Sequence, residues 1–200
     1  MNTDLIKEIA KERYQREHDR KDQINNSLSI PIVVIMALIG VLGFFIINFP
    51  FRAIIDTPGV LIWIVFVLFG LALLGLIICL LIAICYLNKV FSGLTYAYIP
   101  TPKKIKKYTE ELKEYYEETG EDEIEKMIEK DLEEFLIDEY CKNTEINIAK
   151  NKEKSFYLTK AKRFIILSLM LLVLNTIPFV ILHYTEKIII ENIQKIRIIE

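Results

Sequence analysis

The sequence predicts an all-α integral membrane protein with three transmembrane helices and a cytosolic helical domain. The main observation is that residues 24–51, 57–88 and 164–185 contain no Asp, Glu, Lys or Arg. A hydrocarbon core about 30 Å thick needs roughly 20 apolar helical residues to cross it, whereas a helix in a soluble core keeps a polar face for water. No segment shows the alternation that is typical of a strand. We therefore expect three spans, at residues 28–48, 60–87 and 164–184.

The distribution of Lys and Arg predicts the orientation of these spans. Basic residues precede the first span and flank the second and third spans on the side of the charged region, whereas the turn between the first two spans holds only Arg52. The positive-inside rule then places the N-terminus and the charged region in the cytoplasm and the tail outside. A re-entrant third segment would leave the tail inside. We expect a multi-pass protein of the cell inner (plasma) membrane with five segments: an N-terminal cytosolic amphipathic helix (1–26), a transmembrane hairpin (27–88), a cytosolic helical domain (89–162), a third transmembrane helix (163–185) and a C-terminal tail (186–200).

The first span carries a strip of small residues. A helix over 3–23 comes before it, because apolar residues there recur at helical spacing. Ala37, Gly40 and Gly43 then follow one another at three-residue intervals within the span. Small residues along one strip let a neighbouring helix approach closely. We interpret the strip as a helix-packing surface rather than a ligand site.

The charged region opens with a compact basic cluster, formed by Lys103, Lys104, Lys106 and Lys107. Near an anionic inner leaflet, each Lys adds about 1 kcal/mol of membrane attraction. The region from 89 to 163 has 15 basic and 17 acidic residues, a balance that does not favour a nucleic acid as partner. We therefore interpret the cluster as a solvated or lipid-touching membrane-surface patch.

A longer helix follows in the same region, and its apolar stripe must be covered. The stripe can pack on the shorter helix after the basic cluster, on the N-terminal helix or on another subunit. Its members lie at helical spacing: Ile124, Met127, Ile128, Leu132, Phe135, Leu136 and Tyr140.

The third span contains an amide and a helix breaker, Asn175 and Pro178. Pro178 removes a backbone donor and crowds the carbonyl of Leu174, so a kink is expected there. An amide within a span seeks a partner across a helix interface. Two interpretations stay open: the pair lines a pore or a subunit seam, or it forms a locally satisfied kink within one bundle.

The sequence lacks the residues of a catalytic, metal or cofactor site. No zinc spacing links the three Cys, and no phosphate loop, HExxH or GxSxG motif occurs. Arg13 and His18 have an R-x4-H spacing that resembles the RNase motif of HEPN domains. Two such residues in a charge-rich helix leave an enzyme as the last of three alternatives, so we expect no enzyme and no cofactor. The spans also lack the ionisable groups that coupled transporters place at mid-membrane.

The order of the parts resembles the SLATT-type membrane effectors of prokaryotic conflict and anti-phage systems. The matching parts are the charged helix 3–23, the hairpin 28–87 joined by NFPFRAIIDTPG, and the helical extension that follows. A third span is a departure from the two-span pattern. The resemblance implies a homo-oligomeric effector that permeabilises the inner membrane when a cytosolic sensor protein detects infection, with the lipid bilayer as its target. The alternative is a non-toxic scaffold or assembly subunit that tethers a cytosolic partner through the 103–160 helices.

Overall fold

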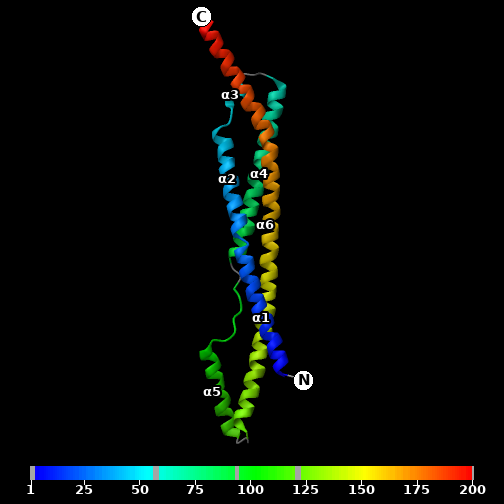
Figure 1. Ribbon diagram of the computed structural model, residues 1–200, viewed down its shortest axis with the longest axis vertical. Helices are drawn as coiled ribbons and strands as arrows, with labels where there is room; N and C mark the ends of the chain where they lie inside the picture. Colours follow the sequence, from blue (N-terminus) through cyan, green and yellow to red (C-terminus); the bar gives the residue numbers. More distant parts are fainter. Residues whose placement is uncertain (1–2, 56–58, 93–94, 120–122, 200) are drawn as a thin grey trace. The chain divides into compact units, whose positions relative to one another are not determined.

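The computed structural model describes residues 3–55, 59–92, 95–119 and 123–199, and every regular element in these ranges is an α-helix (Figure 1). The helices are α1 (Thr3–Asn26), α2 (Ser29–Ile47), α3 (Phe51–Ile55), α4 (Val60–Phe91), α5 (Pro102–Thr119) and α6 (Ile124–Ile199). Three helical stretches are long and apolar enough to cross a membrane, namely Thr3–Ile47, Val60–Phe91 and Ile124–Glu191. The predicted all-α fold with three candidate spans is therefore confirmed.

The chain divides into two compact units. The polar unit contains Met1–Asn26 and Ser92–Phe156, and the apolar unit contains Ser27–Phe91 and Tyr157–Glu200. The apolar unit thus holds all three charge-free windows apart from the first three residues of the first window. The polar unit holds most of the charge, including the basic cluster and the apolar stripe.

Helix α6 is longer than the sequence patterns suggested. It runs without interruption through residues that we expected to form a separate helix, a third span and a tail, and Pro178 lies inside it. No other Pro and no Gly occurs between Ile124 and Ile199, so nothing in this stretch forces the helix to end. Residues 56–58 of the turn expected between the first two spans lie outside the described residues.

The apolar unit is a three-helix bundle whose buried side chains recur every three or four residues. In α4 they include Phe69, Leu76, Leu80, Ala83, Leu87 and Val90. In α6 they are Leu158, Ala161, Ile165, Ser168, Asn175, Phe179 and Leu182. On and just before α2 they are Leu28, Pro31, Ile35, Leu38 and Phe45. A seven-residue repeat of this kind is the pattern of knobs-into-holes packing between helices. We call this set of positions the seam.

Aromatic rings fill the seam near the end of α2. Phe45, Phe69 and Phe179 come from three different helices and form one buried cluster, with ring centroids of Phe45 and Phe179 4.8 Å apart. The surface facing away from the seam is also apolar: Ile30 is 72% exposed and Val173 is 66% exposed. Such an outer surface suits lipid, because water would penalise it.

The polar unit covers the predicted apolar stripe with two helices at once. From α5, the ring of Tyr108 lies 4.4 Å from that of Phe135. From α1, the ring of Tyr14 lies 5.5 Å from that of Tyr140, and Lys7 pairs with Glu133 at 2.9 Å. The stripe is half-buried as a result. Of the predicted partners, the shorter helix and the N-terminal helix both contribute, within one chain.

Candidate functional site

The amide of Asn175 lies inside the seam of the apolar unit. Its side chain is fully buried, and its Nδ2 donates to the backbone carbonyl of Leu171 at 3.1 Å. The Oδ1 atom accepts no hydrogen bond from any residue that the structure describes. Seven residues earlier, Ser168 occupies the same seam position and bonds the carbonyl of Phe164 at 2.8 Å. Ser168 thus uses its hydroxyl locally, whereas Asn175 uses only half of its amide.

Pro178 lies three residues further along the same helix. Helix α6 continues through this residue, but Pro has no N–H to donate to the carbonyl of Leu174. The amide nitrogen of Asn175 is thus satisfied within its own helix, whereas the amide oxygen has no partner among the described residues. Because Asn175 is enclosed by its own chain, it does not lie on the bundle surface, where a residue that lines a pore or contacts another subunit would lie.

The small-residue strip faces outward. Ala37 and Gly40 are exposed and Gly43 is half-exposed. A Cβ built on Gly40 or Gly43 would meet no described atom within 4 Å, whereas one on Gly75 of α4 would lie 3.5 Å from Leu171. The close helix approach that the strip predicts is therefore not made within the described part of this chain, and the strip stays available to another molecule.

The basic cluster occupies the first two turns of α5. Lys103, Lys104, Lys106 and Lys107 surround an open cavity of about 570 Å³ together with Thr101 and Glu110. Lys106 pairs with Glu110 at 3.8 Å and Lys107 with Glu111 at 3.2 Å, exposed pairs that add little stability. Cations at a helix N-terminus oppose the helix dipole. The cluster therefore does not stabilise α5 and remains a charged surface.

The polar unit contains a buried polar cluster that the sequence patterns did not reveal. Asn143, Asn147 and Asn151 lie one helical turn apart on α6 and are all buried. The Asn147 amide donates to the carbonyl of Ala97 and accepts from the N–H of Ala97, both at 2.9 Å. The side-chain amide thus forms with Ala97, in the non-helical segment 95–100, the pair of hydrogen bonds that a neighbouring backbone would otherwise form. The only signal for this site is the four-residue spacing of the three Asn in KNTEINIAKN.

Asn151 links that segment to α1. Its Oδ1 accepts from the Tyr96 hydroxyl at 2.6 Å, and its Nδ2 donates to the carbonyl and the Oε2 of Glu17, both at 2.8 Å. Asn143 reaches the carbonyl of Tyr98 at 3.4 Å. The three Asn therefore join segment 95–100 and α1 to α6. They supply hydrogen-bond partners to backbone groups of a segment that forms no helix of its own.

Two lysines, Lys21 and Lys154, lie over the ring of Tyr96 in the same segment. The Nζ of Lys154 is 5.0 Å and that of Lys21 is 5.2 Å from the centroid of Tyr96. Lys154 is only 7% exposed, and burial, followed by the charge of Lys21, lowers its pKa. Burial likewise raises the pKa of Tyr96. Aromatic faces thus offset part of the cost of holding two ammonium groups close together.

His18 is packed rather than paired with Arg13. Its ring centroid lies 4.6 Å from that of Tyr14 and 5.3 Å from that of Tyr98, while Arg13 is exposed. Five residues of α-helix rotate two side chains about 140° apart, so the R-x4-H spacing does not join them on one face. Among the described residues, no group of three His, Cys, Asp or Glu could hold a metal ion.

No protein-family model, curated protein or solved structure matches this chain.

Proposed function

We propose that the chain is a membrane-embedded oligomeric effector that permeabilises or depolarises the inner (plasma) membrane of a bacterial cell, as part of anti-phage defence. The observation that carries the proposal is the enclosed Asn175, whose amide oxygen has no partner in the described chain. A buried acceptor without a donor costs about 1–3 kcal/mol. The closed bundle is therefore less stable than the same bundle with an apolar residue at this position.

An opened or reassembled bundle removes this cost. If span three rotates so that Asn175 meets water or an amide of another chain, the amide oxygen gains a donor. Pro178 favours such a motion, because the helix lacks one backbone hydrogen bond at that turn. The closed chain is then the resting state, and Asn175 lowers the free-energy difference between the closed and the open state.

The path through the membrane forms between chains rather than within one. The seam of a single chain is filled, since Leu76, Ala83 and Leu182 are all fully buried. The outward strip of Ala37, Gly40 and Gly43 gives a second chain a place to approach closely. The exposed strip supports homo-oligomerisation through this face, which the effector interpretation requires, and the architectural resemblance to SLATT-type effectors also supports that interpretation.

The polar unit takes the role of the cytosolic trigger. We place it with the N-terminus in the cytoplasm on the basis of the Lys and Arg distribution. A cytosolic sensor protein that binds this unit is connected to span three through α6, which is helical from Ile124 to Ile199.

The test uses a potential-sensitive dye in cells that express the full chain with its neighbouring genes, at matched protein levels. Asn175→Leu removes the unpaired amide oxygen from the closed bundle, so we expect an inserted and abundant protein with at least about fivefold less depolarisation, the factor that corresponds to about 1 kcal/mol. Thr176→Val is the matched control: Thr176 is the exposed neighbour and bonds only the backbone of its own helix. Equal depolarisation by parent and Asn175→Leu would make Asn175 a packing residue.

The second candidate is a non-toxic scaffold that tethers a cytosolic partner. One observation favours it: Leu5 and Ile9, one turn apart on α1, are about half exposed, as in a helix face that docks on another protein. If the parent chain never depolarises cells after its partner genes are triggered, and Leu5→Glu releases a bound partner, the scaffold replaces the effector.

A further inference from the structure

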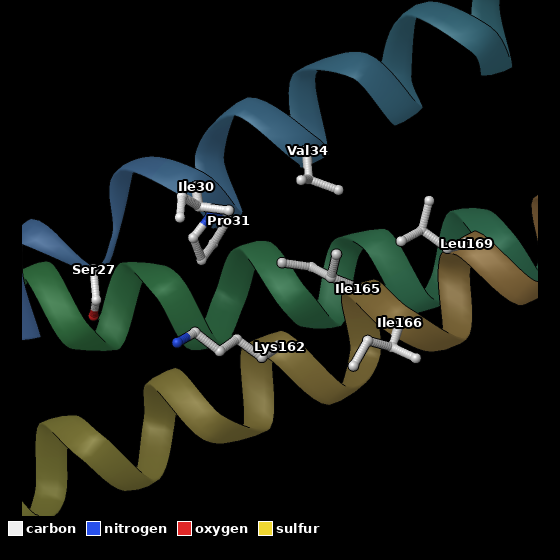
Figure 2. Close-up of a pocket in the computed structure, with 8 residues that line it drawn as sticks. All are labelled: Ser27, Ile30, Pro31, Val34, Lys162, Ile165, Ile166 and Leu169. Atoms are coloured by element: carbon white, nitrogen blue, oxygen red, sulfur yellow. The ribbon is translucent and has the colours of Figure 1, made fainter.

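An apolar groove with one polar end lies between α2 and α6 in the apolar unit. Its volume is about 310 Å³. Figure 2 shows the polar end, where the Lys162 side chain extends toward Ser27, and the apolar side chains that continue away from it. The lining residues are Ser27, Ile30, Pro31, Val34, Lys162, Ile165, Ile166 and Leu169.

The polar end lies where two candidate spans begin. Ser27 comes just before α2, and Lys162 comes two residues before the charge-free stretch 164–185. Both helices run away from this end along the groove (Figure 2). In a bilayer, this end therefore lies at the headgroup level and the rest of the groove extends toward the acyl chains.

Lys162 brings an unneutralised charge to this end. Its side chain is exposed, and no acidic group in the described ranges lies within ion-pair distance of its Nζ. A Lys at the edge of a bilayer attracts anionic headgroups, and basic pockets between spans bind acidic lipid headgroups. The charge and position of Lys162 match a phosphate in the headgroup layer.

The apolar part has the direction and length of an acyl chain segment. From Lys162 to Leu169, α6 rises by about 10 Å, and Ile165 and Ile166 lie between them on the same side. Val34 faces them from α2 (Figure 2). A free phosphate would leave these walls empty, whereas a second protein chain would not need a cation at the mouth.

We propose that this groove binds one anionic phospholipid, with its phosphate on Lys162 and part of one acyl chain against Val34, Ile165 and Leu169. The site would hold a lipid at a fixed place between spans one and three. It does not depend on whether the chain permeabilises a membrane.

The experiment is native mass spectrometry of the full chain in a mild detergent, with phosphatidylglycerol or phosphatidylcholine added at equal concentration. We expect the parent to retain phosphatidylglycerol in preference. Lys162→Gln should lower its retention by about fivefold, the factor that corresponds to about 1 kcal/mol for one Lys at an anionic membrane surface. Arg163→Gln removes the same charge at the next residue, outside the groove lining, and should retain most of the lipid.

A second pair of variants tests the apolar wall. Ile166→Trp places a large ring in the groove and should abolish retention of the lipid. Ile177→Trp is its control, because Ile177 lies three turns along the same helix face and is 63% exposed, against 58% for Ile166. Circular dichroism verifies that each variant keeps the helix content of the parent.

Four results would overturn the site. Equal loss in Lys162→Gln and Arg163→Gln would mean diffuse charge attraction, and equal retention of the two lipids would remove the role of the phosphate. Retention that survives Ile166→Trp would place the lipid elsewhere. A dimer that retains no lipid and dissociates in Ile166→Trp would assign the groove to a second copy of the chain.

Discussion

At the residue scale, two asparagines on the same helix are used in opposite ways. Asn147 is fully buried and uses both ends of its amide on Ala97. Asn175 is equally buried and uses only its nitrogen. A satisfied buried amide specifies one arrangement of the chain, whereas an unsatisfied one weakens the arrangement that encloses it. Asn147 therefore stabilises the folded polar unit, whereas Asn175 lowers the stability of the closed apolar bundle.

The first prediction concerns Asn147. Asn147→Leu leaves the N–H and carbonyl of Ala97 without their partner, so we expect the polar unit to lose about 1–3 kcal/mol of stability. Hydrogen exchange should show faster exchange at the amide of Ala97. Asn143→Ala is the control, since that side chain reaches the carbonyl of Tyr98 only at 3.4 Å; it should cost clearly less. Unchanged exchange at Ala97 would show that the segment is held by other contacts.

The second prediction concerns His18 and pH. Burial, followed by the charge of Lys21, lowers the pKa of His18 below its ordinary value of 6.5, although Asp22 and Asp19 act in the opposite direction. A lowered folded pKa means that the unfolded chain binds the proton more readily. Stability from this group is therefore full above pH 6.5 and decreases as the pH falls from 6.5 through the lowered folded pKa.

The measurement is the thermal unfolding midpoint in detergent at pH 7.5, 6.5 and 5.5. The parent should melt at a lower temperature at pH 5.5 than at pH 7.5. His18→Phe keeps a ring between Tyr14 and Tyr98 but cannot take up a proton, so its midpoint should fall less over the same interval. A parent and variant with the same slope would show that His18 does not carry this pH dependence.

At the element scale, the distribution of charge predicts where the spans lie along the chain. It does not predict which face of each span is buried in the helix bundle. Each charge-free window lies on one of the three candidate spans, but only residues 57–88 match the ends of their helix closely, since α6 extends well beyond both ends of residues 164–185. Lipid and seam are both apolar, so the sequence has little contrast between the two faces of a span. The contrast that remains comes from small and polar seam residues such as Ala83, Ala161 and Ser168.

The candidate site was predictable only in part, for the same reason. Asn175 and Pro178 stand out because they are unusual in an apolar stretch. The outward direction of Ala37 and Gly40 could not be inferred, because it depends on the face that α4 and α6 occupy. The bond between Asn147 and Ala97 joins residues 50 positions apart, and one sequence carries no signal for such a pairing.

The third prediction compares the same substitution on the two faces. Ala83→Leu adds three carbons to a fully buried seam position, so we expect a loss of about 1–3 kcal/mol from overpacking and a lower unfolding midpoint. Ala37→Leu makes the same change on the exposed strip, so the midpoint should stay near that of the parent. In mass photometry in mild detergent, however, Ala37→Leu should shift the chain from oligomer to monomer.

Each half of this result can fail separately. A tolerated Ala83→Leu would mean that the seam is loosely packed. An unchanged oligomer in Ala37→Leu, or a monomeric parent, would remove the small-residue strip from the assembly interface.

At the scale of the whole molecule, the orientation in the membrane decides what each unit can meet. The polar unit can bind a cytosolic sensor only if it lies in the cytoplasm, and the end of α6 then lies on the other side. The basic residues before span one and between spans two and three support this orientation. Helix α6 continues past the third charge-free window to Ile199, so its last turns would project from the far surface.

The fourth prediction tests this orientation with thiol labelling. Cys141 is exposed in the polar unit, and we expect a membrane-impermeant maleimide to label it only after the inner membrane is opened. Cys79→Ala and Cys85→Ala leave it as the single thiol. In a second chain that also carries Cys141→Ala, Glu200→Cys should react in intact cells whose outer barrier admits the reagent. Reporter fusions after residue 120 and after residue 200 should read cytoplasmic and extracytoplasmic in the same cells.

If both thiols stay protected until the inner membrane is opened, the third candidate span does not cross the bilayer. The C-terminus would then lie on the same side of the membrane as the polar unit, and a rotation of span three could not open a path across the membrane.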